Sequence, residues 1–245
     1  MSQTVRIAMW SGPRNISTAM MRSFENRPDC AVVDEPFYAA YLAETGLVHP
    51  MLEEVLASQP GDWRTVAKGL VEDEPAPVFY QKHMTHHMLA DFGVDWMAAC
   101  RNAFLIRDPA AVLASYVQKR AEVSLEDIGV VRQHELFDRE ADRLGRSPPV
   151  VEGADVLADP RGVLGALCAA LDVPFREEML AWPAGPRASD GVWAPAWYEA
   201  VERSTGFSAP ERKTAAALTG DLERIADQAR PHYEALARWK LAAAS

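Results

Sequence analysis

Short apolar runs alternate with longer amphipathic stretches along the first two thirds of this chain. The apolar runs have the length of strands and predict buried parallel strands at 5–10, 31–33, 78–81, 103–106 and 150–152. The amphipathic stretches predict helices at 17–25, 110–121, 125–144 and 161–171. This alternation predicts an α/β fold, a doubly wound domain with a mostly parallel central sheet flanked by helices.

The last third of the sequence has a different composition. Residues 182–207 are rich in Pro, Gly and Trp and predict a long loop. Residues 210–245 return to an Ala-rich helical pattern, in which Pro231 marks a break or a fresh first turn. With 245 residues, 49% of them hydrophobic, the chain can bury a sizeable core. We therefore expect a single domain over residues 1–245.

The charge balance excludes some classes of partner. Lys and Arg number 25 against 35 Asp and Glu, a formal net charge of −10, which argues against nucleic acids and anionic membranes as partners. No stretch approaches the roughly 18 consecutive apolar residues of a membrane helix, and the N-terminal apolar run is too short for a signal peptide. The three cysteines, Cys30, Cys100 and Cys168, form no CxxC pair. We expect a soluble, cytoplasmic protein that binds any anion in a local basic pocket.

The first predicted strand leads into Ser11-Gly-Pro-Arg-Asn-Ile-Ser-Thr18, a turn with one cation and two hydroxyls that opens a helix. Such a turn presents backbone N–H groups, a helix dipole and a positive charge to a phosphate. It is not a Walker A loop, because Ile16 and Ser17 stand where Gly and Lys are needed. The alternative is a plain turn at Gly12, with Ser17 or Thr18 capping the helix.

A second cation follows the fourth predicted strand. Arg107 comes directly after the run 103–106, and Ser115 lies eight residues further, about two helical turns along the next helix. Because α/β sheets bind ligands at the carboxyl ends of their strands, we expect the two cationic segments to face one crevice. The alternative is that Asp108 caps this helix and Pro109 occupies its first position.

Together these residues resemble the sulfotransferases that use 3′-phosphoadenosine 5′-phosphosulfate (PAPS). Residues 11–18 are similar to that family's loop for the 5′-phosphosulfate, and Arg107 with Ser115 resemble its pair for the 3′-phosphate. The resemblance implies a P-loop-like fold and a PAPS site formed by Gly12, Arg14, Asn15, Ile16, Ser17, Thr18, Arg107 and Ser115. Ile16 departs from the family, which usually has Gly at that place.

Further matches extend the resemblance over roughly residues 5–176. Asp34-Glu35-Pro36-Phe37 is similar to the Glu-Pro after the second strand of carbohydrate-type and bacterial sulfotransferases. Lys82 resembles the Lys just beyond the middle strand, and Val173-Pro-Phe175 resembles a Pro-Phe turn of the family.

Sulfuryl transfer needs in-line positioning, charge neutralisation and a general base. Glu35 is the first candidate for the base and His83 the second, with Lys82 beside them as a catalytic residue. Burial would raise the pKa of Glu35, whereas Arg14 or Lys82 would lower it. The alternatives are that Glu35 is a helix-start acid and that Lys82 is an exposed lysine at a strand end.

Histidines follow Lys82 closely in the sequence. His83 and His87 stand at i and i+4 and would share one face of a helix, as metal ligands do. The HExxH pattern is absent, so we predict no metal site and a metal-independent reaction. For His86 and His87 we expect substrate contact or polar packing.

The segment 182–198 holds three of the seven tryptophans. Loops of this kind often cover ligands. In the family that the chain resembles, a late loop closes over the adenosine 3′-phosphate and adds a cation, which implies such roles for Trp193 and Arg187. The alternative is that the aromatic side chains cover the core or the partner of a homodimer.

The sequence thus predicts a sulfotransferase that moves the sulfuryl group of PAPS to a hydroxyl or amine of a small-molecule acceptor. One rival is a P-loop small-molecule kinase, which needs Mg²⁺ and a Walker lysine, yet residues 11–18 contain no lysine. The other rival is a non-catalytic nucleotide-binding protein that keeps the pockets without turnover.

Overall fold

The computed structural model describes residues 4–117, 123–208 and 218–244. Five strands of the described residues form one sheet in the order β2-β3-β1-β4-β5. They are β1 (Val5–Ser11), β2 (Cys30–Asp34), β3 (Val78–Met84), β4 (Arg101–Ile106) and β5 (Val150–Glu152). β2 pairs in parallel with β3, and β4 pairs in parallel with β5. Strands in this orientation need helical crossovers, as the alternating sequence pattern predicts.

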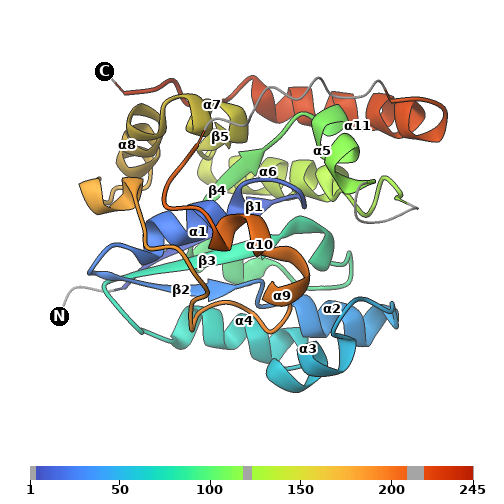
Figure 1. Cartoon of the computed structure of the whole chain (residues 1–245), viewed down its shortest axis with the longest axis horizontal. Coiled ribbons are helices and arrows are strands. Elements are labelled where there is room, and N and C mark those ends of the chain that lie inside the picture. Colours follow the sequence, from blue (N-terminus) through green and yellow to red (C-terminus); the bar gives the residue numbers. More distant parts are fainter. Residues whose placement is uncertain (1–3, 118–122, 209–217, 245) are drawn as a thin grey trace. The chain divides into compact units, whose positions relative to one another are not determined.

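Helices occupy most of the chain between the strands (Figure 1). The α-helices are α1 (Ser17–Glu25), α2 (Tyr38–Thr45), α3 (Leu52–Ser58), α4 (Trp63–Glu72), α5 (Pro109–Tyr116), α6 (Val130–Leu144), α7 (Gly153–Ala158), α8 (Pro160–Ala170), α9 (Ala194–Trp197), α10 (Glu199–Glu202) and α11 (Asp221–Ala237). The 3₁₀ helices are η1 (Thr85–His87), η2 (Asp95–Ala99) and η3 (Glu177–Leu180).

The described residues form two compact units, each with its own packing. The first unit comprises Thr18–Arg101 and Arg176–Phe207, together with the described residues up to Met9. The second unit comprises Trp10–Ser17 and Asn102–Phe175, together with the described residues from Ser208 onward.

In the first unit, β3 is buried along its whole length. Tyr80 of this strand stacks on Phe24 of α1, with 4.4 Å between the ring centroids. Helix α4 begins after Asp62, whose carboxylate accepts a hydrogen bond from the Thr65 N–H as an N-cap. The register of the parallel pair β2–β3 places Asp34 opposite Lys82 at the carboxyl ends of both strands. Two charged residues are therefore neighbours at the edge where ligands bind in such sheets.

In the second unit, α11 packs against α5 and α6 (Figure 1). Apolar side chains of these helices and of the segment before α6 form the contact: Val112, Leu113, Ile128, Val130, Ile225, Ala226 and Ala229. Asp108 accepts a hydrogen bond from the Ala111 N–H and Pro109 is the first residue of α5, so the helix start given above as the alternative is confirmed. Near the C-terminus, Lys240 pairs in parallel with Val150 of β5.

Several predicted boundaries are wrong for identifiable reasons. β3 continues to Met84, so His83 lies in a strand and His87 in η1, and the two do not share a helix face. Helix α6 begins only at Val130, because Gly129 before it is left-handed with φ of 66°. The predicted helix 110–121 ends at Tyr116 among the described residues, and positions 118–121 lie outside them.

The segments after β2 and near the C-terminus also differ from the prediction. Helices α2, α3 and α4 lie between residues 38 and 72, where no helix was predicted, and residues 182–207 contain α9 and α10 rather than loop alone. Helix α11 runs through Pro231 without a break, and residues 210–217 of the predicted C-terminal helix lie outside the described residues. No described helix combines the length and apolar character that crossing a bilayer requires.

Candidate functional site

The loop after β1 is closely packed and irregular. Gly12 has no room for a side chain, because an added Cβ would lie 2.6 Å from the carbonyl oxygen of Ile128. Arg14 adopts the left-handed conformation with φ of 56°, whereas Ile16 is not among the residues with positive φ. The side chain of Ile16, where the similar family has Gly, therefore causes no backbone strain. Ser17 is the first residue of α1, not a cap before it.

The structure brings Arg14, Arg107 and Ser115 together within the second unit. Arg14 Nε donates a hydrogen bond to Ser115 Oγ at 3.1 Å. Arg107 Nη1 donates a hydrogen bond to the carbonyl oxygen of Arg14. The residues predicted for the two phosphate groups of the donor thus adjoin one another, as the two cationic segments were expected to do.

The guanidinium groups of Arg14 and Arg107 are both partly buried. Arg14 contacts Ser115 of α5, and Arg107 contacts the loop that contains Arg14. Burial lowers the pKa of Arg14, and burial together with the neighbouring Arg14 lowers the pKa of Arg107. Among the described residues, neither arginine forms an ion pair with a carboxylate. A bound anion would offset the repulsion and restore favourable interactions for both charges.

Asn15 and Gln133 support this loop from within the second unit. Asn15 Oδ1 accepts a hydrogen bond from the Ile16 N–H at 2.9 Å, and its amide nitrogen donates to the Leu105 carbonyl at 3.3 Å. Gln133 Nε2 donates to the carbonyls of Trp10 and Leu105 at 2.9 and 3.0 Å. No sequence pattern pointed to Gln133, because a glutamine on an amphipathic helix normally indicates an exposed position.

A small hollow opens beside these residues. Its lining comprises Gly12, Pro13, Asn15, Leu105, Arg107, Pro109, Val112, Ile128, Val130 and Gln133. It combines apolar walls with one cation and amide groups, which is the usual chemistry of a small-molecule site.

The second group of polar residues surrounds Lys82 in the first unit. Lys82 Nζ donates hydrogen bonds to Asp34 Oδ1 at 2.8 Å, Glu35 Oε1 at 2.5 Å and Tyr198 Oη at 2.7 Å. Its side chain is 1% exposed, so the interpretation as an exposed lysine at a strand end is wrong. Asp34 and Glu35 raise the pKa of Lys82 well above its usual value although burial opposes them, so it stays charged.

Glu35 is held in an unusual backbone conformation. Its φ of 40° is left-handed, which a residue other than glycine adopts at a cost. Its N–H donates to the Lys82 carbonyl at 2.9 Å, and Gln59 Nε2 donates to the Glu35 carbonyl at 3.2 Å. Gln59 Oε1 also accepts from the Ala39 N–H at 3.1 Å. The strain and these bonds together direct the carboxylate toward Lys82, a role the sequence did not predict for Gln59.

Burial raises the pKa of Glu35 above its ordinary value, although Lys82 opposes that rise. The histidine that faces Glu35 is His87, whose Nδ1 lies 3.9 Å from Glu35 Oε2. Its ring stacks between Tyr38 and Tyr41, with centroids at 4.4 and 4.9 Å. Burial lowers the pKa of His87 well below its usual value, so the imidazole is neutral.

His83 does not join this group. Its ring nitrogen Nε2 lies 3.2 Å from Gln81 Oε1, and the ring packs on Phe37 and Trp96. Alternate residues of a strand point to opposite faces, so His83 points away from the face that carries Lys82. Burial lowers the pKa of His83 to about 3, which makes it a poor base at neutral pH. The structure therefore does not bring the second candidate for the base to the Glu35 group.

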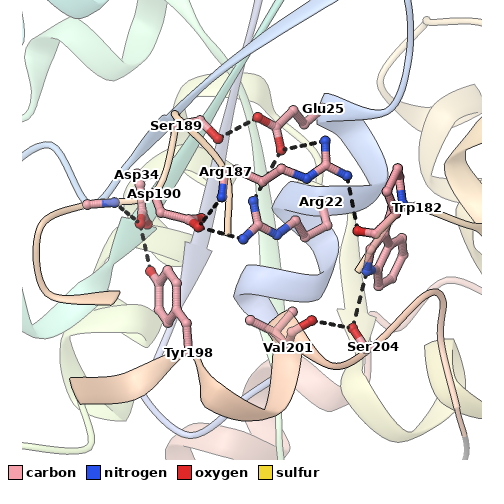
Figure 2. A network of polar contacts seen from close by, with 12 residues as sticks. Arg22, Glu25, Asp34, Trp182, Arg187, Ser189, Asp190, Tyr198, Val201 and Ser204 are labelled. Atoms are coloured by element: carbon pink, nitrogen blue, oxygen red, sulfur yellow. Dashed lines mark hydrogen bonds and ion pairs between the residues drawn. The ribbon is translucent and has the colours of Figure 1, made fainter. Parts of the chain in front are cut away.

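The segment 182–207 is joined by polar contacts to α1 and to Asp34 (Figure 2). Arg22 Nη2 forms an ion pair with Asp190 at 2.7 Å. Arg187, predicted for the donor, has Nη1 4.0 Å from Glu25 Oε2, and its N–H donates to Asp190. Trp193 is 1% exposed and packs in a core cluster, so the interpretation that it covers the core is the one the structure supports.

No group of three or more His, Cys, Asp or Glu side chains among residues 4–117, 123–208 and 218–244 is arranged to hold a metal ion. Metal independence stays a prediction.

Comparison with known proteins assigns the chain to a family. The family model described as "Sulfotransferase domain" matches residues 5–239. Among curated proteins, "Branched-chain-amino-acid aminotransferase-like protein 2" of Arabidopsis thaliana is 35% identical over 208 residues, which cover 84% of this chain and 37% of that protein. The chain therefore spans less than two fifths of this relative's length.

Two solved sulfotransferase structures share the fold. The sulfotransferase domain from the curacin biosynthetic pathway is 17% identical with a TM-score of 0.56, covering 93% of this chain and 98% of that one. The sulfotransferase from Alicyclobacillus acidocaldarius is 12% identical with a TM-score of 0.57, covering 98% of both chains. The predicted fold class, a P-loop-like α/β domain with a mostly parallel central sheet, is confirmed.

Proposed function

The chain belongs to the sulfotransferase family, and from this membership we propose that it moves the sulfuryl group of PAPS to a hydroxyl or amine of a small-molecule acceptor. The observation that carries the proposal is the contact of Arg14 with both Ser115 and Arg107. Two cations and a hydroxyl in one place suit a donor with two separate anionic groups. ATP and ADP lack the 3′-phosphate for which Arg107 and Ser115 are proposed.

The loop residues would neutralise charge as the donor reacts. Arg14, Ser17 and Thr18, with the N–H groups at the start of α1, are suited to the 5′-phosphosulfate. The charge that develops on the bridging oxygen is then stabilised by fixed donors without a metal ion. Gly12 allows the loop to lie against Ile128, and Asn15 holds it to the end of β4.

Glu35 is the proposed general base, since its carboxylate has a raised pKa and a fixed orientation. The acceptor oxygen or nitrogen forms a bond to sulfur while the bond from sulfur to the 5′-phosphate oxygen breaks. The electron pair of that bond leaves on adenosine 3′,5′-bisphosphate, and the acceptor proton passes to Glu35. The Lys82 ammonium favours the ionised form of Glu35, and His87 Nδ1 lies 3.9 Å from Glu35 Oε2.

A transfer assay with PAPS labelled in its sulfuryl group tests the proposal. The chain is incubated with a panel of small phenols, alcohols, sugars and amines in the presence of a chelator, and labelled products are separated from the donor. We expect a labelled acceptor to form without added Mg²⁺. Transfer of phosphoryl from ATP with Mg²⁺ would instead support the kinase, and nucleotide binding without any product would support a non-catalytic protein.

A further inference from the structure

Tyr198 lies in the 182–207 segment and reaches the Lys82 group with its hydroxyl. The hydroxyl donates a hydrogen bond to Asp34 Oδ2 at 2.7 Å (Figure 2). It accepts hydrogen bonds from Lys82 Nζ at 2.7 Å and from Trp193 Nε1 at 3.2 Å. A phenol offers one donor and two acceptor positions, so these contacts use the whole capacity of the group.

Lys82 is equally saturated. An ammonium group has three N–H donors, and Asp34, Glu35 and Tyr198 each accept one. Two carboxylates thus compete for one cation, while Tyr198 supplies Asp34 with a hydrogen bond of its own. Without the Tyr198 hydroxyl, Asp34 Oδ2 would keep only the hydrogen bond from the Gly191 N–H at 3.1 Å. Asp34 would then attract the Lys82 ammonium more strongly.

The position of Tyr198 is fixed by contacts of its segment with α1. Arg22, whose side chain is 1% exposed, pairs with Asp190, and Ser189 donates a hydrogen bond to Glu25 (Figure 2). The Gly191 N–H then joins the same segment to Asp34. Removing one partner of such a buried ion pair leaves an uncompensated charge and is strongly destabilising. The Arg22–Asp190 pair therefore fixes the 182–207 segment to α1.

We infer that Tyr198 is a positioning residue, whose hydroxyl satisfies Asp34 and so keeps the Lys82 ammonium on the Glu35 carboxylate. This inference rests on the proposed role of Glu35 as the base. The titratable groups that face Glu35 are Asp34 from β2, Lys82 from β3, His87 from η1 and Tyr198 itself. Burial raises the pKa of Tyr198 well above its usual value, so its hydroxyl keeps its proton at neutral pH.

Titration of the Glu35 carboxyl by ¹³C NMR in the full chain measures this effect directly, and Glu35→Gln assigns the signal. Tyr198→Phe should move the Glu35 titration to higher pH by about one pH unit, a tenfold change in proton affinity. Tyr80→Phe is the matched control, because its hydroxyl is equally buried and has no hydrogen-bond partner among the described residues. In the Tyr80→Phe chain, the Glu35 carboxyl should titrate at the same pH as in the parent chain. A Tyr198→Phe chain that titrates at the parental pH would overturn the inference.

A second variant covers the case in which Tyr198→Phe does not fold. Asp190→Asn weakens the tie to Arg22 but keeps every residue that touches Lys82, so it should shift the titration in the same direction by less. No shift in Asp190→Asn would then count against the inference.

The titration does not depend on turnover and so separates this inference from the proposed function. A parental chain that transfers no sulfuryl group but shows the tyrosine effect would refute the proposed function alone. Transfer without the tyrosine effect would refute the inference alone.

Discussion

Arg107 donates a hydrogen bond to the main-chain carbonyl of Arg14, so the cation that follows β4 is fixed to the loop that follows β1. Arg14 in turn donates to Ser115 of α5. The two cationic segments of this unit therefore lie against one another, and each predicted contact with a donor nucleotide can be altered separately.

Arg107→Ala should weaken binding of adenosine 3′,5′-bisphosphate about 10- to 100-fold, as expected for the loss of charge-assisted hydrogen bonds. Binding of 5′-ADP should change little, because it has no 3′-phosphate. Calorimetric titration of both nucleotides measures the two effects. Arg203→Ala, which removes a cation that is 71% exposed, is the control. Equal losses for the two nucleotides would show that Arg107 does not bind the 3′-phosphate.

Glu35→Gln should lower kcat by about 10²- to 10⁴-fold while leaving affinity for the bisphosphate unchanged, because the amide cannot take the acceptor proton. In the parental chain, kcat/KM should rise with pH through a pKa above the ordinary value of glutamate, since burial raises the pKa of Glu35. A fully active Glu35→Gln chain would place the base elsewhere.

Buried neutral histidine should make the protein sensitive to acid. The pKa of His83 is about 3 in the folded chain, against 6.5 for the free group, so below pH 6.5 the unfolded chain binds a proton that the folded chain does not. The free energy of unfolding should fall with decreasing pH by up to about 1.4 kcal/mol per pH unit for this one proton.

Urea unfolding of His83→Gln at several pH values checks this dependence. The variant should show a shallower dependence between pH 6.5 and about 4. If the free energy of unfolding of the variant depends on pH as steeply as that of the parent chain, His83 does not cause the acid sensitivity. His232→Gln is the comparison, because His232 is less buried and its pKa is lowered less.

Gly12→Ala should destabilise the folded chain by about 1 to 3 kcal/mol, because the added methyl group would lie too close to the Ile128 carbonyl. Gly165→Ala is the control, since its added Cβ meets only Ala244 at an ordinary 3.7 Å and lies within helix α8. Thermal unfolding of both variants is the measurement. Similar stability of the two would contradict the close approach of the loop to Ile128.

The sequence predicted the five strands of the sheet, because strands covered by helices leave short, continuous apolar runs. It did not predict α2 to α4, although the buried Val66, Ala67 and Leu70 of α4 lie at helical spacing. The four-residue spacing of His83 and His87 would suit one helix face, but β3 runs through His83 to Met84, beyond Lys82, the last residue paired with β2.

The partners of Lys82 could be predicted only in part. Asp34 and Glu35 follow a recognisable strand, and the parallel register brings Asp34 opposite Lys82. Tyr198 and Gln59 come from segments whose path depends on long-range packing, so local patterns carry no signal for them. Arg187 was assigned to the donor by its position in a late loop, and its contacts with Glu25 and Asp190 had no local signal in the sequence.

Thermal unfolding of the chain with adenosine 3′,5′-bisphosphate, compared with 5′-ADP and with ATP plus Mg²⁺, tests the donor site most directly. At about 100 times Kd, a ligand adds roughly 2.7 kcal/mol to the free energy of unfolding, which raises Tm by about 5 to 10 °C for a chain of this size. We expect that rise with the 3′,5′-bisphosphate and little or none with the other two. An equal rise with 5′-ADP, or a rise with ATP and Mg²⁺ alone, would contradict a site built for the 3′-phosphate.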